Sequence, residues 1–525
     1  MLTLDNGVAK LTYTYDALRR LASETSDLRS LVSGLAPHTV SYAYDALGRR
    51  QSLGYPDASR ATYAYDVRNR LTEIDDDARG QPLARYAYDP LGRVEKLTRD
   101  NGVATSYRYD MAGQLTDIAH TKGGQTLVSS QYALDVLGRR TAQTREDNVT
   151  ENYSYDATSQ LTGVSYGTGK AETFAYDAAG NRSEVGRVLP AAPLPRESYQ
   201  ANALNQYTAV AGVALAYDAN GNLVNDGRQA YRYDAQNRLI AVENTAVRAE
   251  FFYDARNRCV LRKYSTPVAA GQWMLNAADS RALTYDTAWN LLAERTLNGV
   301  QAGKYLHGQR TDEILTATVN GQTTYPLADG LGSTVALANK KAKVTDRYRY
   351  DAYGQPRALT ASYQPATATA SAYRFLFTGR EWLASVSLND HRYRYYSPGL
   401  GRWTATDPIR FSGGDINLCR YAENSPHLYN DNFGLTCGSG WNEYLVPDSP
   451  FWDFSSACAK HDACYGTCKK MKSTCDNAFR EDMGRVCGSS VLCYIVANIY
   501  YEAVQDFGGS AYEAAQQEAC AKCKP

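Results

Sequence analysis

A short phrase recurs along the first 350 residues of this chain, and it restricts the possible folds more than any other feature of the sequence. The phrase reads aromatic residue, any residue, Tyr, Asp, any two residues, then Gly or Asn. Clear copies begin at Tyr13, Tyr42, Tyr63, Tyr86, Tyr107, Tyr153 and Tyr231. Between Asp45 and Asp177 the copies lie 21 to 25 residues apart, if Asp135 is counted as a degenerate copy. A repeat this short predicts an array of stacked units and not a row of independent domains.

Each unit is predicted to be a β-hairpin. Aromatic residues at positions i and i+2 lie on one face of a strand, and the Gly or Asn that follows the Asp suits a turn that needs a positive φ. That turn position is occupied by Gly48, Asn69, Gly92, Gly113, Gly138, Gly180, Gly221 and Asn237. One hairpin cannot bury its own aromatic face, whereas a stack of hairpins buries a continuous wall. The sequence therefore predicts a mainly β fold.

This phrase resembles the YD, or Rhs, repeat family, over roughly residues 10–435. The resemblance implies a long β-sheet that spirals into a hollow, cocoon-like shell around a C-terminal toxin. Residues 1–375 are then the predicted shell, residues 376–435 the end of the Rhs core with an autocleavage segment, and residues 436–525 the toxin domain. Because such shells usually contain more strands than this chain provides, the chain is expected to be a fragment or to rely on a partner.

The resemblance also implies how such a protein is used. Members act as effectors that are secreted or delivered into target cells by dedicated machinery, and a cognate immunity protein protects the producer. The N-terminus lacks a basic region followed by an apolar one, so no conventional signal peptide is predicted. The 56 basic and 56 acidic residues give a net charge of zero, so charge offers no argument for a nucleic-acid partner.

The segment before the predicted toxin domain resembles the end of the Rhs core. In that family two aspartates cut the chain after a Leu in an Asp-Pro-x-Gly-Leu motif. The matching positions here are Asp407 and Asp431, with the cut after Leu435, and Asn432 replaces the usual proline. Paired carboxylates suit peptide hydrolysis because one can act as the acid and the other as the base. The alternative is two surface turns that carry ordinary aspartates.

The cysteines mark off the end of the chain. Nine of the 11 lie between Cys437 and Cys523, which predicts a small module stapled by disulfides. At helical spacing, Cys458, His461 and Tyr465 fall on one face. If these cysteines pin the helix to neighbouring segments, His461 is held rigidly enough to serve as a general base. The adjacent Asp462 can bind a hard cation.

These residues resemble the secreted phospholipase A2 family, whose signature fits Cys458, His461, Asp462, Cys464 and Tyr465. The resemblance implies a small α-helical hydrolase of phospholipid esters, with a membrane as its substrate. Its implied site residues are His461 as the catalytic base, Asp476 as the residue that orients it, Tyr465 in support, and Ca²⁺ held by Gly438, Gly440 and Asp462. Trp441 departs from the last glycine of the family's calcium loop, and Asp482 and Asp506 are rivals of Asp476.

Other interpretations stay open at this point. The repeats could belong to a secreted or surface adhesion protein whose stapled tail is catalytically inactive. The cysteine cluster could hold zinc with His461 as a ligand, although no second Cys-x-x-Cys pair stands at finger spacing. The His-Asp pair could also be an ordinary solvated part of a helix.

Overall fold

The computed structural model describes residues 1–77, 81–269, 271–366, 371–410 and 415–435, and, further on, residues 471, 474–475, 477–478 and 480–482. Over this part of the chain the fold is almost entirely antiparallel β-structure, in sheets of 20, 14 and four strands. Paired strands are neighbours in the sequence. The prediction of a mainly β fold built from consecutive hairpins is confirmed.

The first sheet contains β1 (Leu2–Asp5), β2 (Lys10–Tyr15), β3 (Leu21–Asp27), β4 (His38–Tyr44), β5 (Arg50–Gly54), β6 (Arg60–Tyr65), β7 (Leu71–Asp76), β8 (Ala84–Tyr88), β9 (Val94–Arg99), β10 (Ala104–Tyr109), β11 (Leu115–Lys122), β12 (Gln125–Leu134), β13 (Arg140–Arg145), β14 (Thr150–Tyr155), β15 (Leu161–Ser165), β16 (Ala171–Tyr176), β17 (Arg182–Val188), β18 (Glu197–Ala201), β19 (Tyr207–Val210) and β20 (Val213–Ala214).

The second sheet contains β21 (Ala216–Tyr217), β22 (Leu223–Asn225), β23 (Ala230–Tyr233), β24 (Leu239–Glu243), β25 (Arg248–Tyr253), β26 (Cys259–Ala269), β27 (Gln272–Tyr285), β28 (Leu291–Arg295), β29 (Gln301–His307), β30 (Ile314–Val319), β31 (Gln322–Ala328), β32 (Thr334–Ala338), β33 (Val344–Tyr350) and β34 (Pro356–Thr360). The third contains β35 (Glu381–Leu383), β36 (Leu388–His391), β37 (Arg394–Ser397) and β38 (Arg402–Trp403), and the short 3-10 helices are η1 (Phe377–Gly379) and η3 (Ala422–Asn424).

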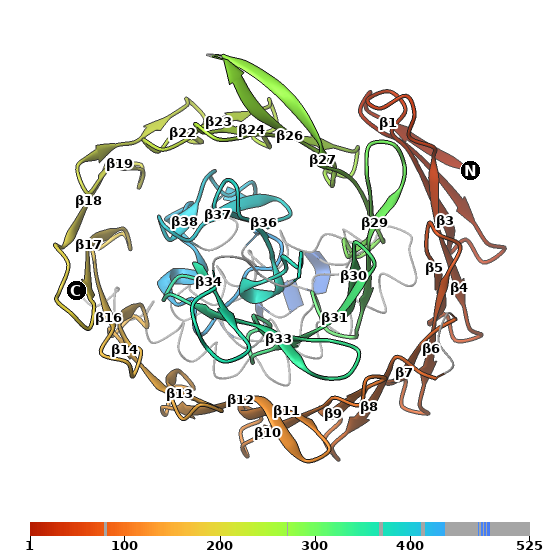
Figure 1. The fold of residues 1–525 in the computed structure, drawn as a ribbon, viewed down its shortest axis with the longest axis horizontal. Coiled ribbons are helices and arrows are strands. Elements are labelled where there is room, and N and C mark those ends of the chain that lie inside the picture. The colour runs from red at the N-terminus through yellow and green to blue at the C-terminus, as the bar shows by residue number, and fades with distance from the viewer. Residues whose placement is uncertain are drawn as a thin grey trace.

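The sheets wind into a spiral wall. In Figure 1 the strands from β3 to β19 form an outer turn, and β29 to β34 lie inside it. Together with β28, whose Leu292 also packs against the outer turn, they form an inner turn. The small sheet of β36 to β38 lies further inside the ring (Figure 1). The predicted spiral is therefore present, and the part of the chain that carries the predicted cleavage residues is enclosed by it.

Hydrogen bonds between the two turns join residues that are far apart in the sequence. The Tyr55 hydroxyl donates to the Tyr305 carbonyl at 3.2 Å, and the Gly330 N–H donates to the Tyr132 hydroxyl at 2.7 Å. The space between the turns is filled by a buried apolar cluster that includes Leu53, Ile74 and Leu97 of the outer turn and Leu292, Leu306 and Leu315 of the inner turn. Each turn thus covers an apolar face of the other, which a single layer of hairpins would leave exposed to water.

The repeated phrase builds the wall through one set of contacts, seen clearly at Asp66. Its Oδ1 accepts the Arg70 N–H at 2.9 Å and its Oδ2 accepts the Arg70 Nε–H at 2.7 Å. The Arg70 guanidinium lies 4.5 Å from the centre of the Tyr88 ring in the next repeat, and the Tyr88 hydroxyl donates back to the Leu71 carbonyl at 2.5 Å. The Asp therefore closes its own turn, while the Arg and the next Tyr tie neighbouring repeats together.

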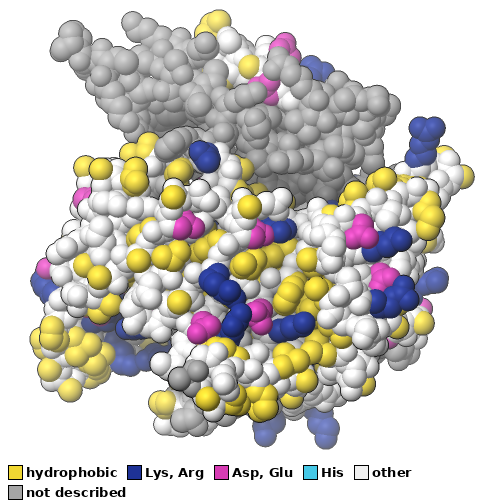
Figure 2. All heavy atoms as spheres, turned by 90° about the horizontal axis from the view of Figure 1, so that it is seen from above, with side chains coloured by type: hydrophobic (Ala, Val, Ile, Leu, Met, Phe, Trp, Pro, Cys, Tyr) yellow, Lys and Arg dark blue, Asp and Glu magenta, His cyan; other side chains and the backbone are white. Residues whose placement is uncertain are grey.

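The same Arg-over-Tyr stacking recurs along the wall. It joins Arg20 to Tyr44, Arg49 to Tyr65, Arg93 to Tyr109, Arg139 to Tyr155 and Arg238 to Tyr253. All eight Gly and Asn residues predicted to need a positive φ have one, between 60° at Asn237 and 88° at Gly92. On the outside, acidic and basic side chains are interspersed over the face seen in Figure 2, as expected for a chain with no net charge.

The residues predicted for the phospholipase site fall outside this part of the chain. None of the described residues is Gly438, Gly440, His461, Asp462, Tyr465 or Asp476. The described residues between 474 and 482 are helical. No helix among the described residues is long and apolar enough to cross a bilayer.

Candidate active site

Asp407 and Asp431 converge on one guanidinium inside the wall. Nη2 of Arg394 lies 2.8 Å from Oδ2 of Asp407 and 3.2 Å from Oδ2 of Asp431. All three side chains are at least nine-tenths buried. Two carboxylates in one buried place require a compensating cation, and Arg394 supplies it. The interpretation of these aspartates as ordinary surface turns does not fit this burial.

Arg394 is fixed in this position from two further sides. Its guanidinium lies 4.2 Å from the centre of the Trp403 ring, and its Nε donates to the Gly434 carbonyl at 2.5 Å. Since Arg394 begins β37 and Trp403 ends β38, the small inner sheet sets the position of the cation between the two carboxylates.

Each backbone carbonyl in the four residues before Leu435 accepts a hydrogen bond. The consecutive carbonyls of residues 431–434 accept hydrogen bonds from the His391 ring, the Arg392 side chain, the Tyr393 backbone and the Arg394 side chain. The Leu435 N–H donates to Oδ1 of Asp431 at 2.9 Å. Residues 391–394, at and around the β36–β37 loop, therefore hold the predicted cleavage segment in one register. The Asp431 carboxylate is hydrogen-bonded to Leu435, the residue before the predicted cut.

Gly434 is required for this close approach. Its φ is +70°, and a Cβ atom at this position would lie 2.9 Å from the Arg394 nitrogen and 3.0 Å from the His391 carbonyl oxygen. Only glycine takes up this backbone conformation against a neighbouring strand without a clash. Gly434, the glycine of the predicted cleavage motif, thus allows the segment to lie close against residues 391 and 394.

The charges around the segment are set by burial and by neighbouring arginines. Burial holds the pKa of His391 well below its usual range, so the ring is neutral, and its Nδ1 must carry the proton because the Asp431 carbonyl can only accept. Burial opposes ionisation of Asp312, but the neighbouring Arg380 and Arg392 guanidinium groups prevail and lower its pKa. Both groups therefore keep one protonation state across the physiological pH range.

Sequence reasoning identified the two aspartates and Leu435 but missed Arg394, Arg392 and His391. The missed residues stand in a run of basic and aromatic residues, 391–396, that looks like an ordinary strand. The one available signal is that two buried carboxylates need a cation close by. Nothing in the spacing singles out Arg394, which is 13 residues from one carboxylate and 37 from the other.

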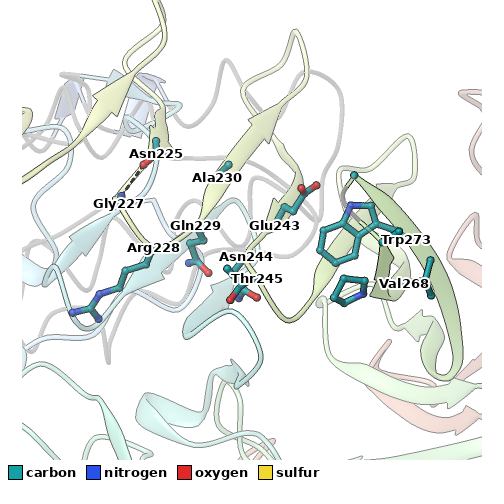
Figure 3. A pocket seen from close by; sticks show the side chains of 13 residues that line it. Asn225, Gly227, Arg228, Gln229, Ala230, Glu243, Asn244, Thr245, Val268 and Trp273 are labelled. Carbon is teal, nitrogen blue, oxygen red and sulfur yellow. Dashed lines mark hydrogen bonds between the residues drawn. The ribbon is translucent and has the colours of Figure 1, made fainter.

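A separate groove of about 660 Å³ lies elsewhere on the wall, between the β26–β27 hairpin and the turns before β23 and β25. Figure 3 shows Trp273 and Val268 on one side of it and Arg228, Gln229 and Asn244 on the other. None of the predicted site residues lines this groove.

Comparison with known families decides the identity of the wall. The family model described as Teneurin YD-shell matches residues 108–426, and the one described as RHS Repeat matches residues 65–104 and 88–126. The chain belongs to the Teneurin YD-shell family. In this YD-shell chain, residues 422–508 also match the family model described as Prokaryotic phospholipase A2. Both family resemblances predicted from the sequence are confirmed by these matches.

Relatives of this YD-shell chain include several toxins and nucleases. The tRNA3(Ser)-specific nuclease WapA of Bacillus spizizenii is 26% identical over 278 residues, which cover 52% of this chain and 11% of the relative. The double-stranded DNA deaminase toxin A of Burkholderia cenocepacia is 27% identical over 308 residues, with coverages of 53% and 20%. Toxin protein Tse5 of Pseudomonas aeruginosa is 26% identical over 322 residues, with coverages of 50% and 24%. The chain thus spans at most about a quarter of the length of these relatives.

Among solved structures, the Tc holotoxin pore of Photorhabdus luminescens superposes on this YD-shell chain with a TM-score of 0.68 at 17% sequence identity. The match covers 82% of this chain and 24% of that one. A crystal structure of the TcdB2-TccC3 complex gives a TM-score of 0.65, also at 17% identity, with coverages of 81% and 24%. At this identity the likeness establishes the shell fold.

Proposed function

We propose that this chain is a toxin whose C-terminal module, residues 436–525, hydrolyses phospholipid esters with the help of Ca²⁺. The observation that carries the proposal is the phospholipase A2 match over residues 422–508, which contains the His461-Asp462 pair in its cysteine framework. His461 would take the proton from the attacking water. The residues that would hold the ion are Asp462, Gly438 and Gly440, and a bound Ca²⁺ would polarise the ester carbonyl.

Under the same proposal the wall encloses the module and the chain cuts itself after Leu435. The buried pair of Asp407 and Asp431 supports this step, because two carboxylates beside one backbone segment can divide the work of acid and base. One carboxylate takes a proton from a water that attacks the Leu435 carbonyl carbon, and the other, protonated, gives its proton to the nitrogen of Thr436 as the peptide bond breaks. Enclosure would also keep a membrane-degrading enzyme away from the membranes of the producer.

The proposed partners follow from the relatives, two of which are named as toxins. The chain is proposed to be delivered into target cells by secretion machinery, and a cognate immunity protein would protect the producer. The nuclease and deaminase activities in the relatives' names are not carried over, because the matches leave most of each relative uncovered.

Lipid hydrolysis is tested by fatty acid release from phospholipid vesicles, using the purified chain and its released C-terminal piece. We expect release that needs Ca²⁺, stops with a chelator and is lost in His461→Ala. Comparing Asp476→Asn with Asp482→Asn identifies the residue that orients the histidine. Release that continues in the chelator would remove Ca²⁺ from the proposed mechanism, and no release at all would favour the adhesion protein with an inactive tail.

Self-cleavage is tested separately by the mass of the purified chain. A cut after Leu435 should be present in the wild type and absent in Asp431→Asn. The same cut in Asp431→Asn and in Asp407→Asn would exclude the carboxylate pair as its cause.

A further inference from the structure

Arg392 also holds the cleavage segment, two residues before Arg394 in the chain. Its Nη1 donates to the Asn432 carbonyl at 2.6 Å, and its guanidinium lies 4.4 Å from the centre of the Phe433 ring. The residue has a φ of +71°, a conformation that costs free energy for any residue with a Cβ and persists only where its surroundings impose it. Arg392 and Tyr393 form the two-residue loop between β36 and β37, and hairpin loops of this length favour a positive φ.

Asp312 is the wall residue that fixes Arg392. Its carboxylate accepts from Nη2 of Arg392 at 2.7 Å and from Nη1 at 3.3 Å, and it accepts from Nη1 of Arg380 at 2.8 Å. The Asp312 and Arg392 side chains are 9% and 4% exposed. A buried, two-point ion pair of this kind holds a guanidinium in one orientation.

The loop that carries Asp312 depends in turn on the outer layer of the wall. This β29–β30 connection is tied to β8, because the Tyr86 hydroxyl donates to Oε2 of Glu313 at 2.9 Å and the Tyr88 hydroxyl donates to Oε1 of Gln309 at 2.6 Å. Contacts therefore run without a break from β8 of the outer turn, through the Asp312 loop of the inner turn, to Arg392 and the backbone at Asn432.

We infer that Asp312 is a positioning residue for self-cleavage, and that the cut becomes possible only when both turns of the wall have closed around the segment. The inference rests on the self-cleavage proposed above. Asp312 does not touch residues 431–435 and acts through Arg392 on the register of the segment. Hydrolysis demands that the reacting carbonyl be placed within fractions of an ångström. A segment that has lost the Arg392 contact and keeps only those of His391, Tyr393 and Arg394 would therefore be cut slowly. Release of the module would thereby follow its enclosure.

The test follows self-cleavage of the full chain over time after cell-free synthesis, by gel and by mass. We expect Asp312→Asn and Arg392→Ala to slow the cut at Leu435 at least tenfold. Tyr86→Phe should slow it less, since it removes one tether of the loop. Adding methylguanidine at non-denaturing concentration should restore part of the rate in Arg392→Ala and none in Asp431→Asn, because only the former leaves a space shaped for a guanidinium.

Glu146→Gln is the matched control. Glu146 also joins the two turns between two arginines, with Arg347 Nη1 at 2.7 Å and Arg349 Nη2 at 3.7 Å, and the Glu146 and Arg347 side chains are each 9% exposed. It should lower the thermal stability of the wall as Asp312→Asn does and leave the cleavage rate unchanged. Equal slowing in Glu146→Gln, or a folded Arg392→Ala chain that cuts at the wild-type rate, would overturn the inference. An uncut wild-type chain would overturn the proposed self-cleavage and the inference with it.

Discussion

Replacing Asp351 with asparagine should stabilise the wall above neutral pH and have little effect in acid. Asp351 stands in the turn after β33, beside Glu172 of β16, where the inner and outer turns meet. Burial, and then repulsion by Glu172, raise the pKa of Asp351 to about 7. Its Oδ1 accepts the N–H groups of Tyr353 at 3.0 Å and Gln355 at 2.8 Å. An asparagine oxygen can accept both bonds without a charge.

The size and the sign of the effect follow from linkage. In the unfolded chain an aspartate has a pKa near 3.9, about three units below the pKa of Asp351 in the folded chain. Each unit of this difference changes the free energy of unfolding by about 1.4 kcal/mol. The wild type should therefore lose up to about 4 kcal/mol of stability as the pH rises from about 4 to 7, and Asp351→Asn should not. With about 2 cal/mol/K of unfolding entropy per residue, this is a difference of about 4 °C in Tm for a domain of this size.

The assay is thermal unfolding of both chains at pH 4.5, 6 and 8, compared at each pH so that other titrating groups cancel. Asp66→Asn is a matched control at the same turn position. The hydrogen bond from the Arg70 backbone, together with the Arg70 side chain, lowers the pKa of Asp66, so this variant should be less stable than the wild type at pH 8. A Tm difference between Asp351→Asn and wild type that does not change with pH would refute the argument.

Three further outcomes follow. Arg258→Ala should cost about 3–5 kcal/mol in urea unfolding, because it removes the cation paired with buried Asp254 and leaves Glu24 only the longer contact with Arg256. A loss as small as that of the more exposed Arg70→Ala would contradict this. Gly434→Ala should slow self-cleavage strongly and change Tm little, because the added Cβ would push the segment away from β37. The cleavage rate is measured by mass and Tm by thermal unfolding, and an unchanged rate would show that the register of the segment is not critical. Asp462→Asn should abolish Ca²⁺-dependent fatty acid release, and full activity would remove Asp462 from the proposed ion site.

Contacts between the turns of the spiral explain what sequence reasoning missed. The histidines illustrate this. His38 and His120 are buried, and burial, aided by neighbouring arginines, lowers the pKa of each to about 3. His120 donates to the Ala328 carbonyl, 208 residues away. No local pattern marks these positions, because the partner arrives from the other turn.

The sequence by itself determined the hairpin, its turn and its repetition, since these depend on residues within one repeat: the Asp that closes the turn, the Gly or Asn that accepts a positive φ, and the alternating aromatic face. Family motifs also singled out Asp407, Asp431 and Leu435. The tertiary structure alone decided that Arg394 pairs with both carboxylates and that Asp312 reaches the cleavage segment through Arg392. The physical reason is range: backbone preferences act over a few residues, whereas the pairing of buried charges depends on how the turns of the spiral pack against each other.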